Sequence, residues 1–267
     1  MQRLFTAYLS DEVRGMRGYF EYRIRSGRCV EVKRVAMELG SRSVSRSRGR
    51  KASKSAESKI RANEREQAKN LARTLNCNFD ASSVFVTLHY PNAFLPSSRE
   101  EAKAYITKFM RRAKDIFKRR YPGKTLRYVL VTADRQTKKD AKARIHHHIV
   151  MDDIGWELVR GLWFAEYAKM EYLDATGDYT KLAVYMLRNV DKHERERAWT
   201  TSRGNLEKPV YEAPVPVTER GRIRIPKNAS LKERTEYVNA ETLERFEYCR
   251  WTVPAPPRRK RVKRNDN

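Results

Sequence analysis

The sequence predicts an α+β protein with an antiparallel sheet of about five strands and helices packed on it. Runs of β-branched and apolar residues that indicate strands occur at residues 82–90, 126–134 and 144–151. Between the first two runs, apolar residues recur at helical spacing as far as the turn sequence Tyr121-Pro122-Gly123. Strands and amphipathic helices therefore occur together in the same part of the chain.

The first expected elements are a hairpin, a basic segment and a helix. Residues 18–35 predict a β-hairpin, because two runs of β-forming residues flank the turn pair Ser26-Gly27. Residues 41–57 consist mainly of Ser, Arg and Lys, so they cannot bury a core and should form a flexible basic segment. A polar helix with a narrow apolar stripe is expected from about residue 58 to residue 75.

The middle of the chain should supply the sheet and most of the helices. Residues 82–90 carry β-branched or apolar side chains on both faces, as expected of a central strand. Ser97 and Ser98 each precede a glutamate by three residues, which is a helix-capping pattern. Further helices are expected at residues 156–172 and 178–189.

The C-terminal part predicts a helix near residues 230–245, a strand over the sequence FEYCRWTV and a Pro-rich basic tail that should be disordered. The sequence thus predicts five regions: an N-terminal hairpin region (1–40), a flexible basic segment (41–57), a core domain (58–204), an α/β extension (205–252) and the tail (253–267).

The composition indicates a partner of negative charge. The chain has 58 Lys and Arg residues against 33 Asp and Glu residues, a formal net charge of +25, which favours binding to nucleic acid. No apolar run approaches the length of a membrane helix and the first residues lack a signal-peptide core, so no membrane partner is expected. Cys29, Cys77 and Cys249 show no metal-binding spacing, and we interpret them as reduced thiols of a cytoplasmic protein.

Three consecutive histidines stand in the strand at residues 144–151. Because side chains alternate along a strand, His146 and His148 should share one face, about 7 Å apart, and His147 should point to the other. Such a pair can converge on one metal ion; the alternative is a surface strand with solvated histidines. Asp134, at the end of the preceding strand, could add an oxygen ligand, which would favour Mg or Mn, or could be an ordinary turn residue.

A tyrosine lies between two cations in the expected helix at residues 178–189. Helical spacing places Lys181 and Arg188 on the same face as Tyr185, where they could hold a phosphate beside a nucleophilic hydroxyl. The alternative is a core tyrosine that packs with Leu182 and Met186.

The order of these motifs resembles the HUH endonucleases that initiate rolling-circle DNA replication. The motifs are FVTLHYP, VTAD, RIHHHIVM and LAVYMLRN, in that order. More closely, the sequence is similar to replication proteins of the filamentous-phage gene II type, which have phrases like LARTLNCNFD before the histidines and RAWTTSRGNLEKP after the tyrosine helix. The likeness covers about residues 40–210.

The resemblance implies an HUH endonuclease fold with the metal strand in the middle of the sheet. It implies that His146 and His148 hold a divalent metal and that Tyr185 is the nucleophile, with Arg188 where the family usually has lysine. The implied activity is nicking and rejoining of single-stranded DNA at a replication origin through a 5′-phosphotyrosine link, with a host polymerase and helicase as partners. Ala133 stands where relatives often carry glutamate, so the third ligand stays open.

Two other functions remain open at this point. One is a single-tyrosine HUH transposase, although those enzymes are usually shorter. The other is a non-catalytic nucleic-acid-binding protein. A covalent DNA adduct that depends on Tyr185 would separate both enzymes from the binding protein, and a replication origin rather than transposon ends would separate the two enzymes.

Overall fold

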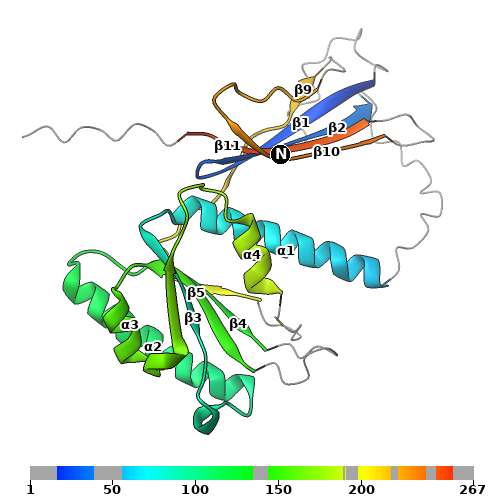
Figure 1. Ribbon diagram of the computed structural model, residues 1–267. Coiled ribbons are helices and arrows are strands. Elements are labelled where there is room, and N and C mark those ends of the chain that lie inside the picture. The colour runs from blue at the N-terminus through cyan, green and yellow to red at the C-terminus, as the bar shows by residue number, and fades with distance from the viewer. Residues whose placement is uncertain are drawn as a thin grey trace, which may run out of the picture. The chain divides into compact units, whose positions relative to one another are not determined.

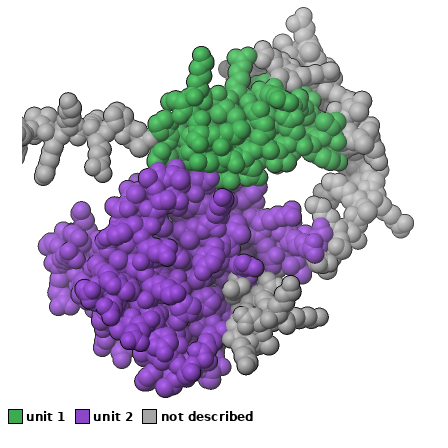
Figure 2. All heavy atoms as spheres, viewed as in Figure 1, with its two compact units in different colours: residues 1–41, 211–267 green, residues 42–210 purple. Residues whose placement is uncertain are grey.

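The computed structural model describes residues 17–38, 56–134, 144–188, 190, 198–217, 222–238 and 245–254. The chain divides into two compact units, one made of residues 1–41 with 211–267 and one made of residues 42–210 (Figure 2). The expected basic segment as far as residue 55 and the tail from residue 255 lie outside the described residues.

The unit of residues 42–210 contains a five-stranded sheet (Figure 1). Its spatial order is β6 (Ala168–Tyr172), β3 (Ser83–Leu88), β5 (His146–Asp152), β4 (Tyr128–Ala133) and β7 (Thr200–Thr201). All four neighbouring pairs are antiparallel. The expected antiparallel sheet of about five strands is therefore confirmed, and the histidine strand β5 is its middle strand.

Four α-helices cover this sheet in the described part of the unit (Figure 1). On one face, α1 (Ala56–Asn78) and α4 (Thr180–Leu187) share a core with Val129, Val131 and Val150 of the sheet. On the other face, α2 (Arg99–Arg120) and α3 (Trp156–Leu162) share a core with the inward side chains of β3 and β5. The protein thus has an α+β architecture with helices on both faces of the sheet.

Helix α2 begins where the capping pattern predicts. The Ser98 side chain accepts a hydrogen bond from the backbone N–H of Glu101, and Ser97 bonds the Glu101 carboxylate in return. The buried stripe of the helix is made of Ala102, Ile106, Phe109, Met110, Ala113 and Phe117. This local signal defined the helix correctly because cap and stripe agree. Two short 3-10 turns, Asn92–Phe94 and Ala165–Tyr167, complete the helical structure.

The prediction of a helix over residues 156–172 is wrong in its second half. The helix ends at Leu162, and Ala168–Tyr172 form the edge strand β6. Leu88 and Val84 of β3 pair with the two ends of β6, so the backbone of this segment is used by the sheet. Tertiary pairing here overrides a local pattern that reads equally well as helix.

The other unit contains a sheet whose strands come from the N-terminal and the C-terminal parts of the described chain. Its strands are β1 (Arg17–Ser26), β2 (Cys29–Glu38), β8 (Val210–Tyr211), β9 (Val215–Val217), β10 (Ser230–Val238) and β11 (Arg245–Thr252). The predicted hairpin is present, with Gly27 in the turn at a φ of 56°. The helix expected near residues 230–245 is wrong for Ser230–Val238, which pair with β11 as a strand despite their Leu, Lys and Glu residues.

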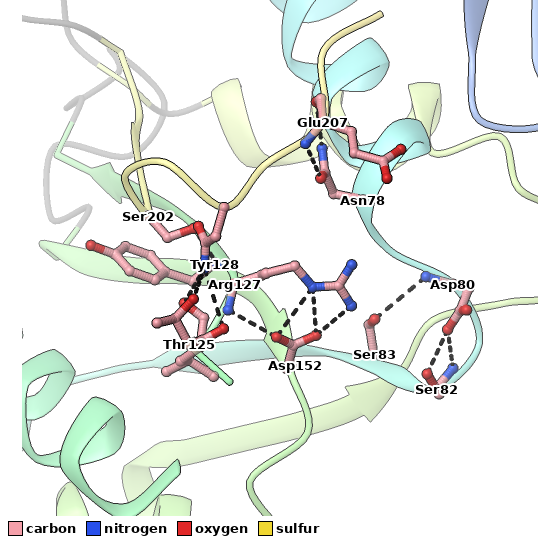
Figure 3. Close-up of polar contacts among 12 residues, drawn as sticks. Asn78, Asp80, Ser82, Ser83, Thr125, Arg127, Tyr128, Asp152, Ser202 and Glu207 are labelled. Atoms are coloured by element: carbon pink, nitrogen blue, oxygen red, sulfur yellow. Dashed lines mark hydrogen bonds and ion pairs between the residues drawn. The ribbon is translucent and has the colours of Figure 1, made fainter. Parts of the chain in front are cut away.

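A polar network ties the segment after α4 to the end of the sheet opposite the histidines (Figure 3). The Asn78 amide donates to the backbone carbonyl of Glu207 at 3.0 Å and accepts from its N–H at 2.7 Å. The Ser202 N–H donates to the carbonyl of Tyr128 at 3.0 Å, and the Ser202 hydroxyl accepts from the Tyr128 N–H at 3.3 Å, which secures β7 to β4. The two sequence phrases that carry the resemblance, around Asn78 and around Glu207, are thus bonded to each other. No helix in the described residues has both the length and the apolar character needed to cross a membrane.

Candidate active site

The three consecutive histidines divide between the two faces of the sheet, as strand alternation predicts. His148 pairs with Thr87 and Val131, whereas His147 pairs with Leu88 and Thr132 on the face covered by α2. The Nε2 atoms of His146 and His148 lie 3.1 Å apart. The two rings are thus directed to a common point on the face that also carries α4.

The Nδ1 atom of each of these two histidines has its own hydrogen-bond partner. Nδ1 of His146 lies 2.8 Å from the carbonyl oxygen of Arg144, which can only accept, so Nδ1 carries the proton and the neutral ring has a lone pair on Nε2. Nδ1 of His148 lies 3.3 Å from the Thr87 hydroxyl. Burial, then His146 and His89, lowers the pKa of His148 to about 3, so this ring is neutral near pH 7. Backbone and hydroxyl partners of this kind orient metal-binding histidines.

The spacing of the two Nε2 atoms fits two ligands of one metal ion. Metal–nitrogen bonds of roughly 2.1 Å put neighbouring ligand nitrogens roughly 3.0–3.4 Å apart, and the observed separation is 3.1 Å. No group of three or more His, Cys, Asp or Glu side chains that could hold a metal ion occurs among the described residues. A cation at this pair would therefore need further ligands from water or substrate.

His147 is a core residue. Its side chain is fully buried, Nε2 lies 2.7 Å from the Tyr90 hydroxyl and Nδ1 lies 3.0 Å from the Thr132 hydroxyl. Burial, followed by the neighbouring His146 and His148, lowers its pKa to about 3. Both ring nitrogens are satisfied on the face away from the histidine pair, so His147 has a structural explanation.

Helix α4 brings Tyr185 to the histidine pair. The ring of Tyr185 lies 5.1 Å from that of His148 and 6.1 Å from that of Phe85. Its side chain is 53% exposed, so the alternative of a core tyrosine is wrong; Met186 occupies the core in its place. Lys181 and Arg188 are also exposed, as a shared helix face requires.

Contacts at the start of helix α4 and along its buried face fix its position. At its start, the Asn76 side chain of α1 accepts a hydrogen bond of 2.8 Å from the backbone N–H of Tyr179. The Tyr179 hydroxyl in turn donates to the carbonyl of Asp174. Along its length, Ala183 and Met186 pack with Leu71 and Leu75 of α1. These contacts fix the rotation of α4 and leave Tyr185 towards β5.

The structure does not bring Asp134 to the histidine pair. Ala133 pairs with His146, so Asp134 follows on the opposite face, where its carboxylate forms an ion pair of 2.5 Å with Arg99 of α2. A third ligand from Asp134 is therefore a prediction that the geometry contradicts. Strand alternation gives this result only once the pairing of Ala133 with His146 is known.

His89 is a site residue that the sequence pattern did not indicate. It follows β3, and its ring stacks on that of His146 with 5.1 Å between centroids. Burial, then His146 and Lys169, lowers its pKa. The available signal was its position at the end of a strand next to the histidine strand, which requires the sheet order. The backbone carbonyl of His89 accepts a hydrogen bond from the Trp163 indole, which fixes the backbone there.

Comparisons of the chain with protein-family models, with curated proteins and with solved structures find no match. Only the residues and geometry of the site itself therefore indicate a function.

Proposed function

We propose that the chain is an HUH-type endonuclease that nicks and rejoins single-stranded DNA to initiate rolling-circle replication. The observation that carries the proposal is the convergence of the His146 and His148 Nε2 atoms, 3.1 Å apart, beside the half-exposed ring of Tyr185. The position of β5 in the middle of a five-stranded antiparallel sheet also agrees with the HUH fold. The formal net charge of +25 favours a polyanionic substrate.

In the proposed reaction, the phenolic oxygen of Tyr185 attacks the scissile phosphorus in line. A bond forms between this oxygen and phosphorus, the bond from phosphorus to the 3′ oxygen breaks, and the phenolic proton is finally taken up by the leaving 3′ oxygen. Arg188 and Lys181 stabilise the negative charge that accumulates on the phosphate. Rejoining is the reverse attack by a 3′ hydroxyl and requires no ATP.

The metal in this proposal is Mg or Mn, held by His146 and His148. When bound, it would polarise the scissile phosphate as a Lewis acid. The hydrogen bonds of their Nδ1 atoms to Arg144 and Thr87 keep the two imidazoles in the required orientation. The ring of His89 stacks on that of His146 and supports its position, and Asp134 has no role in this scheme.

The test is formation of a covalent adduct on single-stranded oligonucleotides that tile the DNA around the coding region, in the presence of Mn. A 5′-phosphotyrosine link attaches the protein to the 3′-labelled product and releases the 5′-labelled one. Tyr185→Phe should abolish the denaturant-resistant adduct and retain DNA binding. Tyr237→Phe is the matched control, because Tyr237 is similarly exposed, at 62% against 53%, and lies on β10 in the other unit.

Mass-spectrometric mapping of the adduct decides which residue reacts. An adduct on Tyr185 that also requires His146 and His148 supports the proposal. An adduct on another residue contradicts it. DNA binding without an adduct on any oligonucleotide would favour a non-catalytic binding protein.

A further inference from the structure

A groove lies between α2 and the β4–β7 edge of the sheet, on the face of the sheet that carries His147. Its volume is about 660 Å³, within the roughly 300–1,000 Å³ typical of ligand sites. The wall from α2 includes Lys103, Arg111 and Lys114, and the sheet side includes Tyr128 and Trp199. The groove therefore has a basic wall and an aromatic wall.

The three cations of the basic wall are distributed along helix α2 and do not form a single cluster. Lys103 and Lys114 are eleven residues apart, which corresponds to about 16 Å along a helix axis. All three cations are exposed, and within the described part of the chain none of them forms an ion pair. Asp115 is the acidic side chain of this lining, and Arg99 is already paired with Asp134. An extended anion fits this row better than a single phosphate.

The aromatic wall offers ring surfaces to the same space. Trp199 is half-buried, with its inner side packed against the core cluster that includes α4. The Lys114 ammonium lies 4.9 Å from the centre of the Tyr128 ring. Cations that follow a backbone, combined with rings on which bases stack, are the features that single-stranded nucleic acids require.

The groove continues beyond Trp199 around the edge of the sheet. A second hollow shares Tyr128 and Trp199 with the first and extends to Gln67 of α1 and to Arg203. The segment that carries Trp199 and Arg203 is anchored by the Ser202 bonds to Tyr128 (Figure 3). A strand in the groove would thus pass from the α2 face towards the α1 face along a fixed edge.

We propose that this groove binds a single-stranded polynucleotide, with phosphates on Lys103, Arg111 and Lys114 and bases stacked against Trp199 and Tyr128. The groove lies on the opposite face of the sheet from Tyr185 and the histidine pair. The proposal does not depend on cleavage, and its tests measure binding alone, so it can fail or hold independently of the proposed nicking activity.

The first test is the salt dependence of oligo-dT binding by the full chain, measured by fluorescence anisotropy. The groove variant Lys103→Gln/Arg111→Gln/Lys114→Gln removes three cations. The control variant Lys108→Gln/Arg112→Gln/Lys118→Gln removes three exposed cations of the same helix that lie outside the groove. Each lost phosphate contact lowers the log–log salt slope by roughly 0.7 on single strands, so the groove variant should lose about 2. Equal losses in both variants would overturn the proposal, because they would indicate only the net charge.

The second test concerns base stacking at Trp199. Trp199→Leu should weaken the binding of oligo-dT by about tenfold, because one stacked base is lost, and should not change the binding of an abasic oligonucleotide of equal length. Trp199→Phe should bind oligo-dT as the wild type does, because phenylalanine still offers a ring for stacking. Equal weakening with the abasic strand, or tighter binding of duplex than of single strands, would overturn the inference. Oligo-U in parallel identifies the preferred source: tighter binding of oligo-dT through the groove assigns it to DNA and tighter binding of oligo-U assigns it to RNA.

Discussion

Replacing His147 with leucine separates a core histidine from the candidate metal ligands on either side of it. Leucine refills most of the buried volume but removes the 2.7 Å hydrogen bond between Nε2 of His147 and the Tyr90 hydroxyl. That hydroxyl is buried, and its other contact, to the carbonyl of Ala102, is long at 3.4 Å. An orphaned buried hydroxyl costs about 1–3 kcal/mol. We therefore expect His147→Leu to lower the free energy of unfolding by about 2 kcal/mol.

The double variant provides the internal check. Tyr90→Phe alone should cost a similar amount, because it leaves Nε2 of the buried His147 without its hydrogen-bond partner. In the double variant neither atom of the bond between residues 90 and 147 is left unsatisfied, and the loss of the Thr132 contact is the same as in His147→Leu alone. The loss in the double variant should therefore be about 1–2 kcal/mol smaller than the sum of the two single losses. Urea denaturation followed by circular dichroism measures all three values.

The variants at positions 146 and 147 should rank in opposite order for adduct formation and for stability. At a temperature where each variant is folded, His147→Leu should retain adduct formation. His146→Ala, a change at a less buried position, should cost under about 1 kcal/mol of stability and abolish the adduct. The reasoning is refuted if His147→Leu is as stable as the wild type, if the two single losses simply add, or if loss of activity is equal at both positions.

Three further predictions concern pH, the third ligand and the tail. Burial lowers the pKa of His147 and of His148 from 6.5 to about 3, so between pH 6.5 and pH 3 the unfolded chain binds more protons than the folded chain. The free energy of unfolding should therefore fall from pH 6.5 towards pH 3, by up to about 1.4 kcal/mol per pH unit for each of the two histidines. Denaturation experiments at several pH values measure this, and a free energy of unfolding that does not change with pH would contradict the prediction. In Mn titrations of adduct formation, His89→Ala should weaken the apparent metal affinity about 10–100-fold, as for groups that support a metal site. Asp134→Asn should leave the affinity within about twofold, because Asp134 forms an ion pair with Arg99. A larger loss with Asp134→Asn than with His89→Ala would make Asp134 a candidate metal ligand again. Deleting residues 255–267 should weaken DNA binding and lower the slope of log affinity against log salt concentration by roughly 0.7 for each lost phosphate contact. Adduct formation at saturating protein should be unchanged. Filter binding at several salt concentrations measures the slope, and an unchanged slope would show that the tail does not contribute to binding.

The elements that could be predicted were those with a complete local signal. The cap at Ser98 and the apolar stripe behind it defined α2, and Gly27 marked the turn of the hairpin. Strand alternation separated His147 from the histidines on either side of it, and helical spacing put Tyr185 with two cations. Each of these patterns is written within a few consecutive residues, because side-chain direction repeats every two residues in a strand and every 3.6 in a helix.

The remaining features depend on which segments lie next to each other, and local periodicity carries no information about that. Residues 168–172 and 230–238 became strands because neighbouring strands could pair with them. His89 reached His146 only through the pairing of β3 with β5, and the exposure of Tyr185 followed from the packing of α4 on α1. The sequence by itself determined the chemistry available on each element; sheet order and helix packing decided which of those side chains meet, since contacts between distant residues exist only once register and topology are set.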